Sequence, residues 1–177
     1  ETDLTIETEF RKLLSQDEIK KGQISLLNTR IQCDDKVTEK NLTSMENQFT
    51  KALNLFPNNY EFDVIGYGCT SASLLIGDDK ISRIVRSKVH ANNVTTPMSA
   101  VKKALETLGA NKIGYIAPYS SEIAIKMCSH LSEAGFQIVN AATFAEDRDS
   151  VVGIITPESI FKAIEILVGK SHNLEAI

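Results

Sequence analysis

The stretch FDVIGYGCTSASLLIG, residues 62–77, decides the fold class. Its first six residues form a short run with apolar side chains on both sides, which is typical of a parallel strand covered on both faces. Small and hydroxyl residues then surround Cys69, and the residues up to Gly77 read as a short helix. We therefore predict a buried parallel strand, then a tight turn, then a helix.

The same alternation of strand and helix extends along the rest of the chain. Helical patterns cover residues 5–14, 38–56, 78–88, 96–108, 120–134 and 157–168, and strand patterns cover 23–31, 113–117, 136–143 and the residues from Leu174 on. Alternation at this spacing predicts an α/β fold with parallel sheets and two similar halves. We place the boundary between residues 94 and 95, which gives halves of residues 1–94 and 95–177.

The composition is that of a folded protein with a modest negative charge. Of 177 residues, 42% are hydrophobic and 24% are charged, and 19 basic against 23 acidic residues give a net charge of -4. This balance argues against non-specific nucleic-acid binding, and no apolar run approaches the ~20 residues of a membrane span. The N-terminus does not resemble a signal peptide, and three widely spaced cysteines form neither a disulfide framework nor a metal-binding knuckle. We expect a reduced, cytoplasmic protein with no metal, nucleic-acid or membrane partner.

Cys69 is the leading candidate for a reactive group. It lies between a predicted strand and a predicted helix, and ligands of open parallel sheets bind at such strand ends. A helix N-terminus favours the thiolate, so we expect a lowered thiol pKa; a buried structural cysteine is the alternative. Thr70 and Ser71 offer donors for a carboxylate or enolate oxygen. The sequence has no phosphatase-loop arginine after Cys69 and no GxSxG, GxGxxG or Walker A pattern.

Five segments together resemble one family. They are DLTIETEFR at residues 3–11, DVIGYGCTSAS at 63–73, TT at 95–96 with the helix after it, APY at 117–119 and ITPE at 155–158. In this order they look like the aspartate/glutamate racemase superfamily, and within it the branch of maleate cis-trans isomerases and arylmalonate decarboxylases. The resemblance implies two pseudo-symmetric, Rossmann-like halves with parallel sheets, and a site between them at the carboxyl ends of the strands.

The resemblance also implies an activity. Members of this superfamily typically work without a metal or organic cofactor and use cysteines near the α-carbon of the substrate. Cys69 takes the position of the first cysteine, which implies a base or nucleophile, and Thr70, Ser71 and Tyr119 would hold the substrate carboxylate and the enolate-like charge. We therefore expect a cofactor-independent isomerase or racemase of a small carboxylate, either an Asp/Glu racemase or a maleate isomerase type.

The sequence departs from the family pattern in three places. A second cysteine would follow the strand that begins at Leu174, and another strand would precede Glu1, so we expect these 177 residues to be part of a longer protein. Two asparagines expected near the substrate of maleate isomerases are Asp3 and Asp149 in this chain. Carboxylates lack N–H donors and repel a dicarboxylate, so they favour a substrate with an amino group, such as an amino acid.

Two other functions stay open at this point. One is a decarboxylase or lyase of the same superfamily, although the filled first-cysteine position argues against it. The other is a non-catalytic homologue that binds carboxylates without turnover, which the two aspartates would allow. We expect structural or incidental roles for Cys33 and Cys128 and for the three histidines. A homodimer is an expectation from the family resemblance alone.

Overall fold

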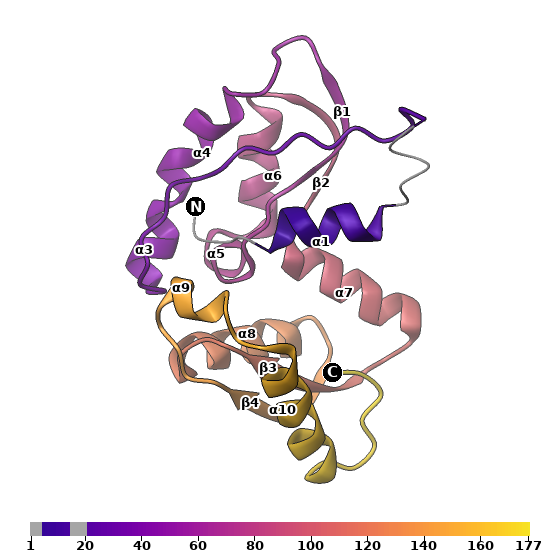
Figure 1. Cartoon of the computed structure of the whole chain (residues 1–177). Coiled ribbons are helices and arrows are strands. Elements are labelled where there is room, and N and C mark those ends of the chain that lie inside the picture. Colours follow the sequence, from indigo (N-terminus) through magenta and orange to yellow (C-terminus); the bar gives the residue numbers. More distant parts are fainter. Residues whose placement is uncertain (1–4, 15–20) are drawn as a thin grey trace.

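Two pairs of parallel strands, each covered by helices, form the framework of the chain (Figure 1). The structure is a computed structural model that describes residues 5–14 and 21–177. Helix α1 (Ile6–Leu13) comes first and buries none of its residues. Because helices alternate with parallel strands in both halves, the predicted α/β class is confirmed.

The N-terminal sheet joins β1 (Glu61–Gly66) to β2 (His90–Thr95), with Gly66 opposite Thr95. The helices of this half are α3 (Glu39–Ser44), α4 (Glu46–Leu53), α5 (Thr70–Ile76) and α6 (Asp78–Arg86). Their apolar faces meet β1 in one core, to which Phe49, Ile65, Tyr67, Ala72 and Ile81 contribute. Since the two strands run in the same direction, their carboxyl ends lie at one edge of the sheet, where the Cys69 turn begins.

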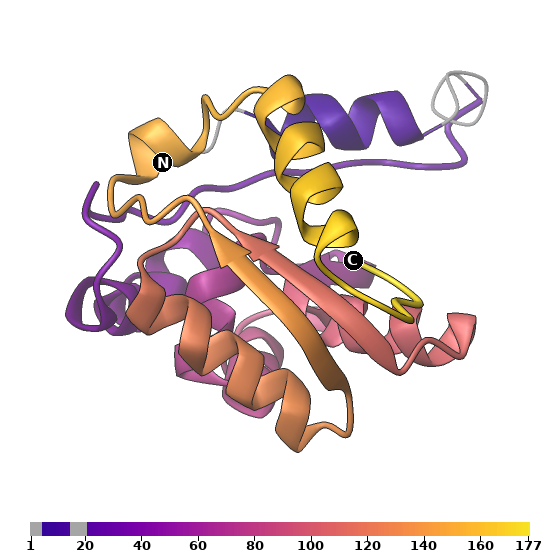
Figure 2. The same ribbon diagram turned by 90° about the horizontal axis from the view of Figure 1, so that it is seen from below.

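The second sheet joins β3 (Lys112–Ala117) to β4 (Gln137–Thr143). Figure 2 shows α8 (Ser121–Glu133) and α10 (Pro157–Gly169) on opposite faces of this pair. Beyond α10, Ala176 forms a parallel bridge to Ile113, and its carbonyl accepts the Gly114 N–H at 2.8 Å. The predicted strand from Leu174 on therefore begins on the free edge of β3.

Helices α7 (Pro97–Leu108) and α8 bind the two halves together. Ile123 and Met127 of α8 belong to the same core as β1 and α5, and Tyr119 packs against that core. Met98 and Leu105 of α7 lie in a second core with residues of β3 and α8. The predicted boundary between residues 94 and 95 falls at the end of β2. Apolar packing joins the two halves across this boundary, so the division into two domains stays a prediction.

The strand predicted at residues 23–31 is wrong. These residues are extended, and half-buried positions alternate with exposed ones along much of the stretch, which is the pattern of a strand. Within the described residues, however, they pair with no neighbouring strand. Thr29 instead donates through its hydroxyl to the carbonyl of Ala52 at 3.2 Å, so α4 fixes the segment in place of a sheet. Alternation alone cannot show whether a partner strand is present.

Two further predictions differ from the structure. The helix predicted over residues 38–56 breaks at Met45 into α3 and α4, because the Met45 N–H bonds the Leu42 carbonyl in a tightened turn and the Ser44 hydroxyl bonds the Asn41 carbonyl. Strand β2 was not predicted, since its sequence, HANNVT, is largely polar. The other predicted elements agree with the structure within a few residues.

Candidate active site

Cys69 occupies the turn between β1 and α5. Tyr67, directly after β1, donates its N–H to the Thr95 carbonyl at 2.9 Å, so the chain follows β2 for one more residue. Cys69 is then the N-cap of α5 in an extended conformation, and its carbonyl accepts the Ser73 N–H at 3.0 Å. A Cβ at Gly68 would lie 2.7 Å from Ile6 Cδ1, so glycine lets α1 pack against this turn.

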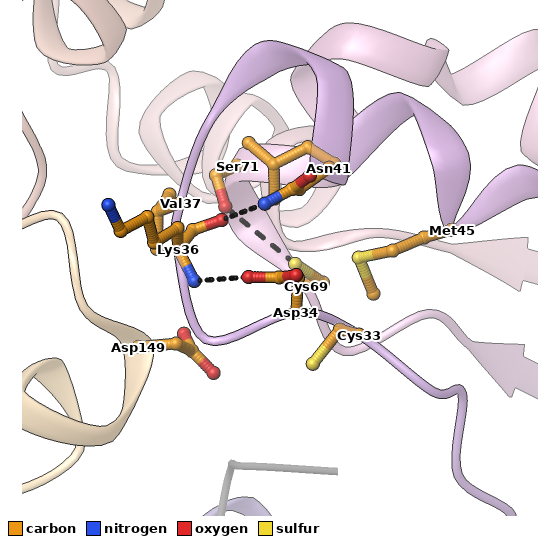
Figure 3. A pocket seen from close by; sticks show the side chains of 10 residues that line it. Cys33, Asp34, Lys36, Val37, Asn41, Met45, Cys69, Ser71 and Asp149 are labelled. Carbon is orange, nitrogen blue, oxygen red and sulfur yellow. Dashed lines mark hydrogen bonds between the residues drawn. The ribbon is translucent and has the colours of Figure 1, made fainter.

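A small cavity of about 30 Å³ lies beside the Cys69 thiol. Figure 3 shows that its walls come from distant parts of the chain: the Cys69 turn, the extended segment before α3, and α9 (Asp149–Val152) of the second half. The lining residues are Cys33, Asp34, Lys36, Val37, Asn41, Leu42, Met45, Cys69, Ser71 and Asp149. This volume holds one or two water molecules, so there is little free space beside the sulfur.

The structure brings most of the predicted site residues together. The Sγ of Cys69 lies 3.7 Å from the Ser71 hydroxyl. The Ser71 and Thr70 side chains lie near enough to Tyr119 to act on the pKa of its phenol. Asp149 lines the same cavity, and its charge acts on both Cys69 and Tyr119. Asp3 lies outside the described residues. Roles of these residues toward a substrate remain predictions.

The predicted lowering of the Cys69 pKa is wrong, since burial raises the pKa of the thiol. Hydrogen bonds from the Ala72 N–H and the Ser71 hydroxyl favour the thiolate, but they are weaker than the cost of desolvation. The negative charge of Asp149 and the nearby Cys33 thiol raise the pKa further. Cys69 therefore rests as a neutral thiol at neutral pH.

Tyr119 is a neutral hydrogen-bond donor in this site. Burial, with a smaller contribution from the charge of Cys69, raises the pKa of Tyr119 to about 12, although hydrogen bonds from Ser71 and Thr70 act in the opposite direction. The phenol therefore keeps its proton at neutral pH. Together with the Ser71 and Thr70 hydroxyls, it can stabilise negative charge on a substrate oxygen.

A set of hydrogen bonds donated by backbone N–H groups, here called the clamp, holds α9 against the N-terminal half. The Asp149 N–H donates to the Asp35 carbonyl at 2.7 Å, and the Ser150 N–H donates to the Asp35 carboxylate at 2.9 Å. Val37 donates its N–H to the Asp147 carbonyl at 2.7 Å. The Ser150 hydrogen bonds lower the pKa of Asp35, so this carboxylate stays charged and keeps Asp149 beside Cys69.

The cavity also contains residues that the sequence reasoning passed over. Cys33, to which we assigned an incidental role, lies in the cavity wall, as does Met45 at the break between α3 and α4. No sequence motif marks either residue. The segment that contains Cys33 reaches the site through its packing against α4, and a local sequence pattern does not show such packing. Cys128, in contrast, lies on α8, and its thiol does not line this cavity.

In residues 5–14 and 21–177, no group of three or more His, Cys, Asp or Glu side chains is arranged to hold a metal ion. Over the same ranges, no helix has both the length and the apolar character required to cross a membrane.

Comparison with known proteins gives matches among solved structures. Neither protein-family models nor curated proteins match the sequence. The maleate isomerase Iso from Pseudomonas putida S16 matches with a TM-score of 0.79 and 17% identity, over 93% of this chain and 68% of that one. For maleate cis-trans isomerase from Nocardia farcinica bound to TRIS, the TM-score is 0.76 and the identity 22%, over 96% of this chain and 71% of that one.

The chain has the maleate isomerase fold. Arylmalonate decarboxylase matches less closely, with a TM-score of 0.59 and 12% identity over 75% of this chain and 57% of that one. These similar proteins are maleate isomerases and an arylmalonate decarboxylase, so the resemblance to that branch, predicted from five sequence segments, is confirmed at the level of the fold. A serine variant of the Nocardia farcinica enzyme, 20% identical and with a TM-score of 0.76, holds a covalently bound succinylcysteine intermediate.

Proposed function

We propose that this chain is a cofactor-independent isomerase or racemase of a small carboxylate, with the Cys69 sulfur as the reacting atom. One observation carries the proposal: the hydroxyls of Ser71, Thr70 and Tyr119 gather beside a cysteine at a strand end of a maleate isomerase fold. A thiol supplies the base or nucleophile, and the three hydroxyls supply donors for the charge that develops on the carboxylate.

With an unsaturated dicarboxylate, the reaction begins with addition of the thiolate. The sulfur bonds one alkene carbon, and the electron pair of the double bond moves into the adjacent carboxylate as an enolate. Rotation about the resulting single bond and loss of the thiolate then give the trans isomer. The succinylcysteine found in the Nocardia farcinica enzyme supports this route, because it is the protonated form of such an adduct.

With an amino acid, the same thiolate would remove the α-proton. Asp149 favours this second substrate class, since its carboxylate lies in the cavity wall and would attract an ammonium group. Both routes need the thiolate, which burial makes the minor form at neutral pH. The rate should therefore rise with pH until the pKa of Cys69 is reached.

Both routes also need a reduced cysteine. All three cysteines are described, and none is part of a disulfide. We therefore retain the cytoplasm as the expected compartment, because thiols are kept reduced there.

Proton NMR in deuterium oxide tests the proposal, with maleate, aspartate and glutamate as separate substrates. Conversion of maleate to fumarate indicates addition and rotation, and loss of the α-proton signal indicates racemase chemistry. We expect Cys69→Ser to lower the rate by about 10²–10⁴-fold, because the thiolate is removed. Cys128→Ser, which changes a thiol outside the cavity, should leave the rate unchanged.

Other outcomes would contradict the proposal. Carbon dioxide release from substituted malonates, without isomerisation or exchange, would show a decarboxylase. Binding of these carboxylates without isomerisation or loss of the α-proton signal in the NMR spectra would show a non-catalytic homologue. Equal rates for the wild type and Cys69→Ser would remove Cys69 from the chemistry.

A further inference from the structure

Tyr67 is a buried tyrosine two residues before Cys69, and the reaction described above does not use it. Its side chain is 7% exposed, and its ring lies 4.6 Å from the ring of Phe49 at an interplanar angle of 44°. Its N–H is bonded to the Thr95 carbonyl, so the backbone is fixed as well. The phenol therefore has a single position, beside the Cys69 turn.

The hydroxyl of Tyr67 has a sulfur atom as its hydrogen-bond partner. It donates to Met45 Sδ over 3.9 Å, and Met45 lines the same cavity as the Cys69 thiol, whose charge acts on the phenol. A thioether is a weak acceptor, and a contact of this length is far longer than an ordinary O–H···O bond. Buried phenols usually find a stronger acceptor than this. The neutral thiol of Cys69 does not provide one, but its thiolate would.

We propose that Tyr67 is a further residue of the active site, whose hydroxyl donates to the Cys69 thiolate and stabilises it. In the resting thiol, the phenol proton is shared with the weak Met45 acceptor. When Cys69 loses its proton, the hydroxyl turns to the sulfur anion. A hydrogen bond to a charged acceptor is about twice as strong as a neutral one, and more so away from water. The thiolate would then have donors from Tyr67, the Ser71 hydroxyl and the Ala72 N–H.

The titration behaviour of the two groups supports this geometry. Burial raises the pKa of Tyr67 far above its usual range, and the charge of Cys69 raises it further. Tyr67 therefore still holds its proton when Cys69 titrates, and it can act only as a donor. Among the described residues, the other titratable groups that face the thiol are Asp149 from α9, Cys33 from the extended segment, and Tyr119 from the loop before α8. Asp149 and Cys33 disfavour the thiolate, and a hydrogen bond from Tyr67 would counteract this effect.

The test is the pH dependence of alkylation of Cys69 by iodoacetamide, followed by peptide mass spectrometry. We expect Tyr67→Phe to shift the midpoint upward by about one pH unit, which is about tenfold less thiolate at neutral pH. Tyr115→Phe is the matched control. Its hydroxyl donates to Met127 Sδ at 2.7 Å, which is the same kind of contact in the other half of the molecule. This variant should leave the midpoint unchanged.

A second variant keeps the proposal testable even if Tyr67→Phe does not fold. Met45→Leu conserves volume and removes the competing acceptor, so the midpoint should move downward. Far-ultraviolet circular dichroism and urea unfolding would show that each variant is folded. An unchanged midpoint in both Tyr67→Phe and Met45→Leu would overturn the proposal, as would an equal upward shift in Tyr115→Phe.

The inference rests on the proposed function only in taking Cys69 as the reacting thiol. Alkylation reports the thiolate whether or not any substrate is turned over. A shift in Tyr67→Phe together with NMR silence on every substrate would support the role of Tyr67 and reject the activity. Turnover that depends on Cys69, with no shift of the midpoint in Tyr67→Phe, would support the activity and reject the role of Tyr67.

Discussion

At the scale of single residues, the environment of Cys69 combines donors that favour its thiolate with groups that oppose it. Burial has the largest effect, and the charge of Asp149 adds to it. Because like charges disfavour one another, removing the carboxylate charge should make the thiolate easier to form. The same carboxylate would repel a dicarboxylate substrate and attract an amino group.

The variant Asp149→Asn separates these effects. We expect it to lower the pKa of Cys69, measured as a downward shift in the alkylation midpoint, and to raise turnover of maleate relative to aspartate. Asp147→Asn is the matched control, since it removes the same charge from the same loop but does not act on Cys69. An equal shift in both variants would mean that the general charge of the loop, not Asp149, sets the thiol pKa.

Part of the site could be predicted because several of its residues are neighbours in the sequence. Cys69, Thr70 and Ser71 are adjacent in the sequence, and Tyr119 follows a strand whose carboxyl end faces the same region. The raised pKa of the thiol could not be predicted. It depends on desolvation by segments far away in the sequence, including the one that contains Cys33.

At the scale of elements, the N-terminus of α7 is the best-capped helix end near the boundary between the halves. The Thr96 hydroxyl accepts the Ser99 N–H at 3.0 Å and donates to Asp78 at 2.6 Å, and Thr96 is 3% exposed. Thr96→Ala removes a cap and leaves the half-buried Ser99 N–H and Asp78 carboxylate with one partner fewer. We expect a loss of about 2 kcal/mol in the free energy of unfolding, measured with urea.

Thr156→Ala is the control for this prediction. Thr156 caps α10 in the same way, with the Ser159 N–H at 3.3 Å, but it is exposed. Water can replace an exposed cap, so the loss should stay below about 1 kcal/mol. A smaller loss for Thr96→Ala than for Thr156→Ala would contradict the importance of the buried contact with Asp78.

Elements with strong local signals were predicted well, and elements fixed by distant contacts were not. The proline and capping threonine that open α7 and α10 are visible in the sequence, and Gly109 ends α7 with a positive φ. The polar strand β2 could not be predicted, since its position depends on pairing with β1 along the register from His90 to Thr95. The break at Met45 is equally invisible, because apolar periodicity continues through it.

At the scale of the whole molecule, the clamp at Asp35 determines how the two halves meet over the site. Asp35→Ala removes the carboxylate that accepts the Ser150 N–H, so α9 should separate more often from the N-terminal half. We expect faster alkylation of Cys69 with a lower midpoint, because Asp149 and part of the burial are removed from the thiol, and faster hydrogen exchange at residues 149–153. Asp34→Ala is the control, because that carboxylate bonds the nearby Lys36 N–H on its own segment.

The clamp should also depend on pH. Hydrogen bonds from Ser150 lower the pKa of Asp35 in the folded protein, so its carboxylate contributes fully to closure above the usual pKa of an aspartate. That contribution is lost as the pH falls through the lowered pKa. Protection of residues 149–153 from exchange, relative to the intrinsic rate at each pH, should therefore fall in acid for the wild type, and an equal fall in Asp35→Ala would contradict this assignment.

The small volume of the cavity has a kinetic consequence. With room for one or two water molecules, it cannot admit a four-carbon acid while the hydrogen bonds of Asp35 are intact. Association would then wait for α9 to move away, and the observed binding rate would level off at high ligand concentration instead of growing in proportion to it. Product would leave by the same path, so the opening frequency of a four-residue helix would limit every turnover.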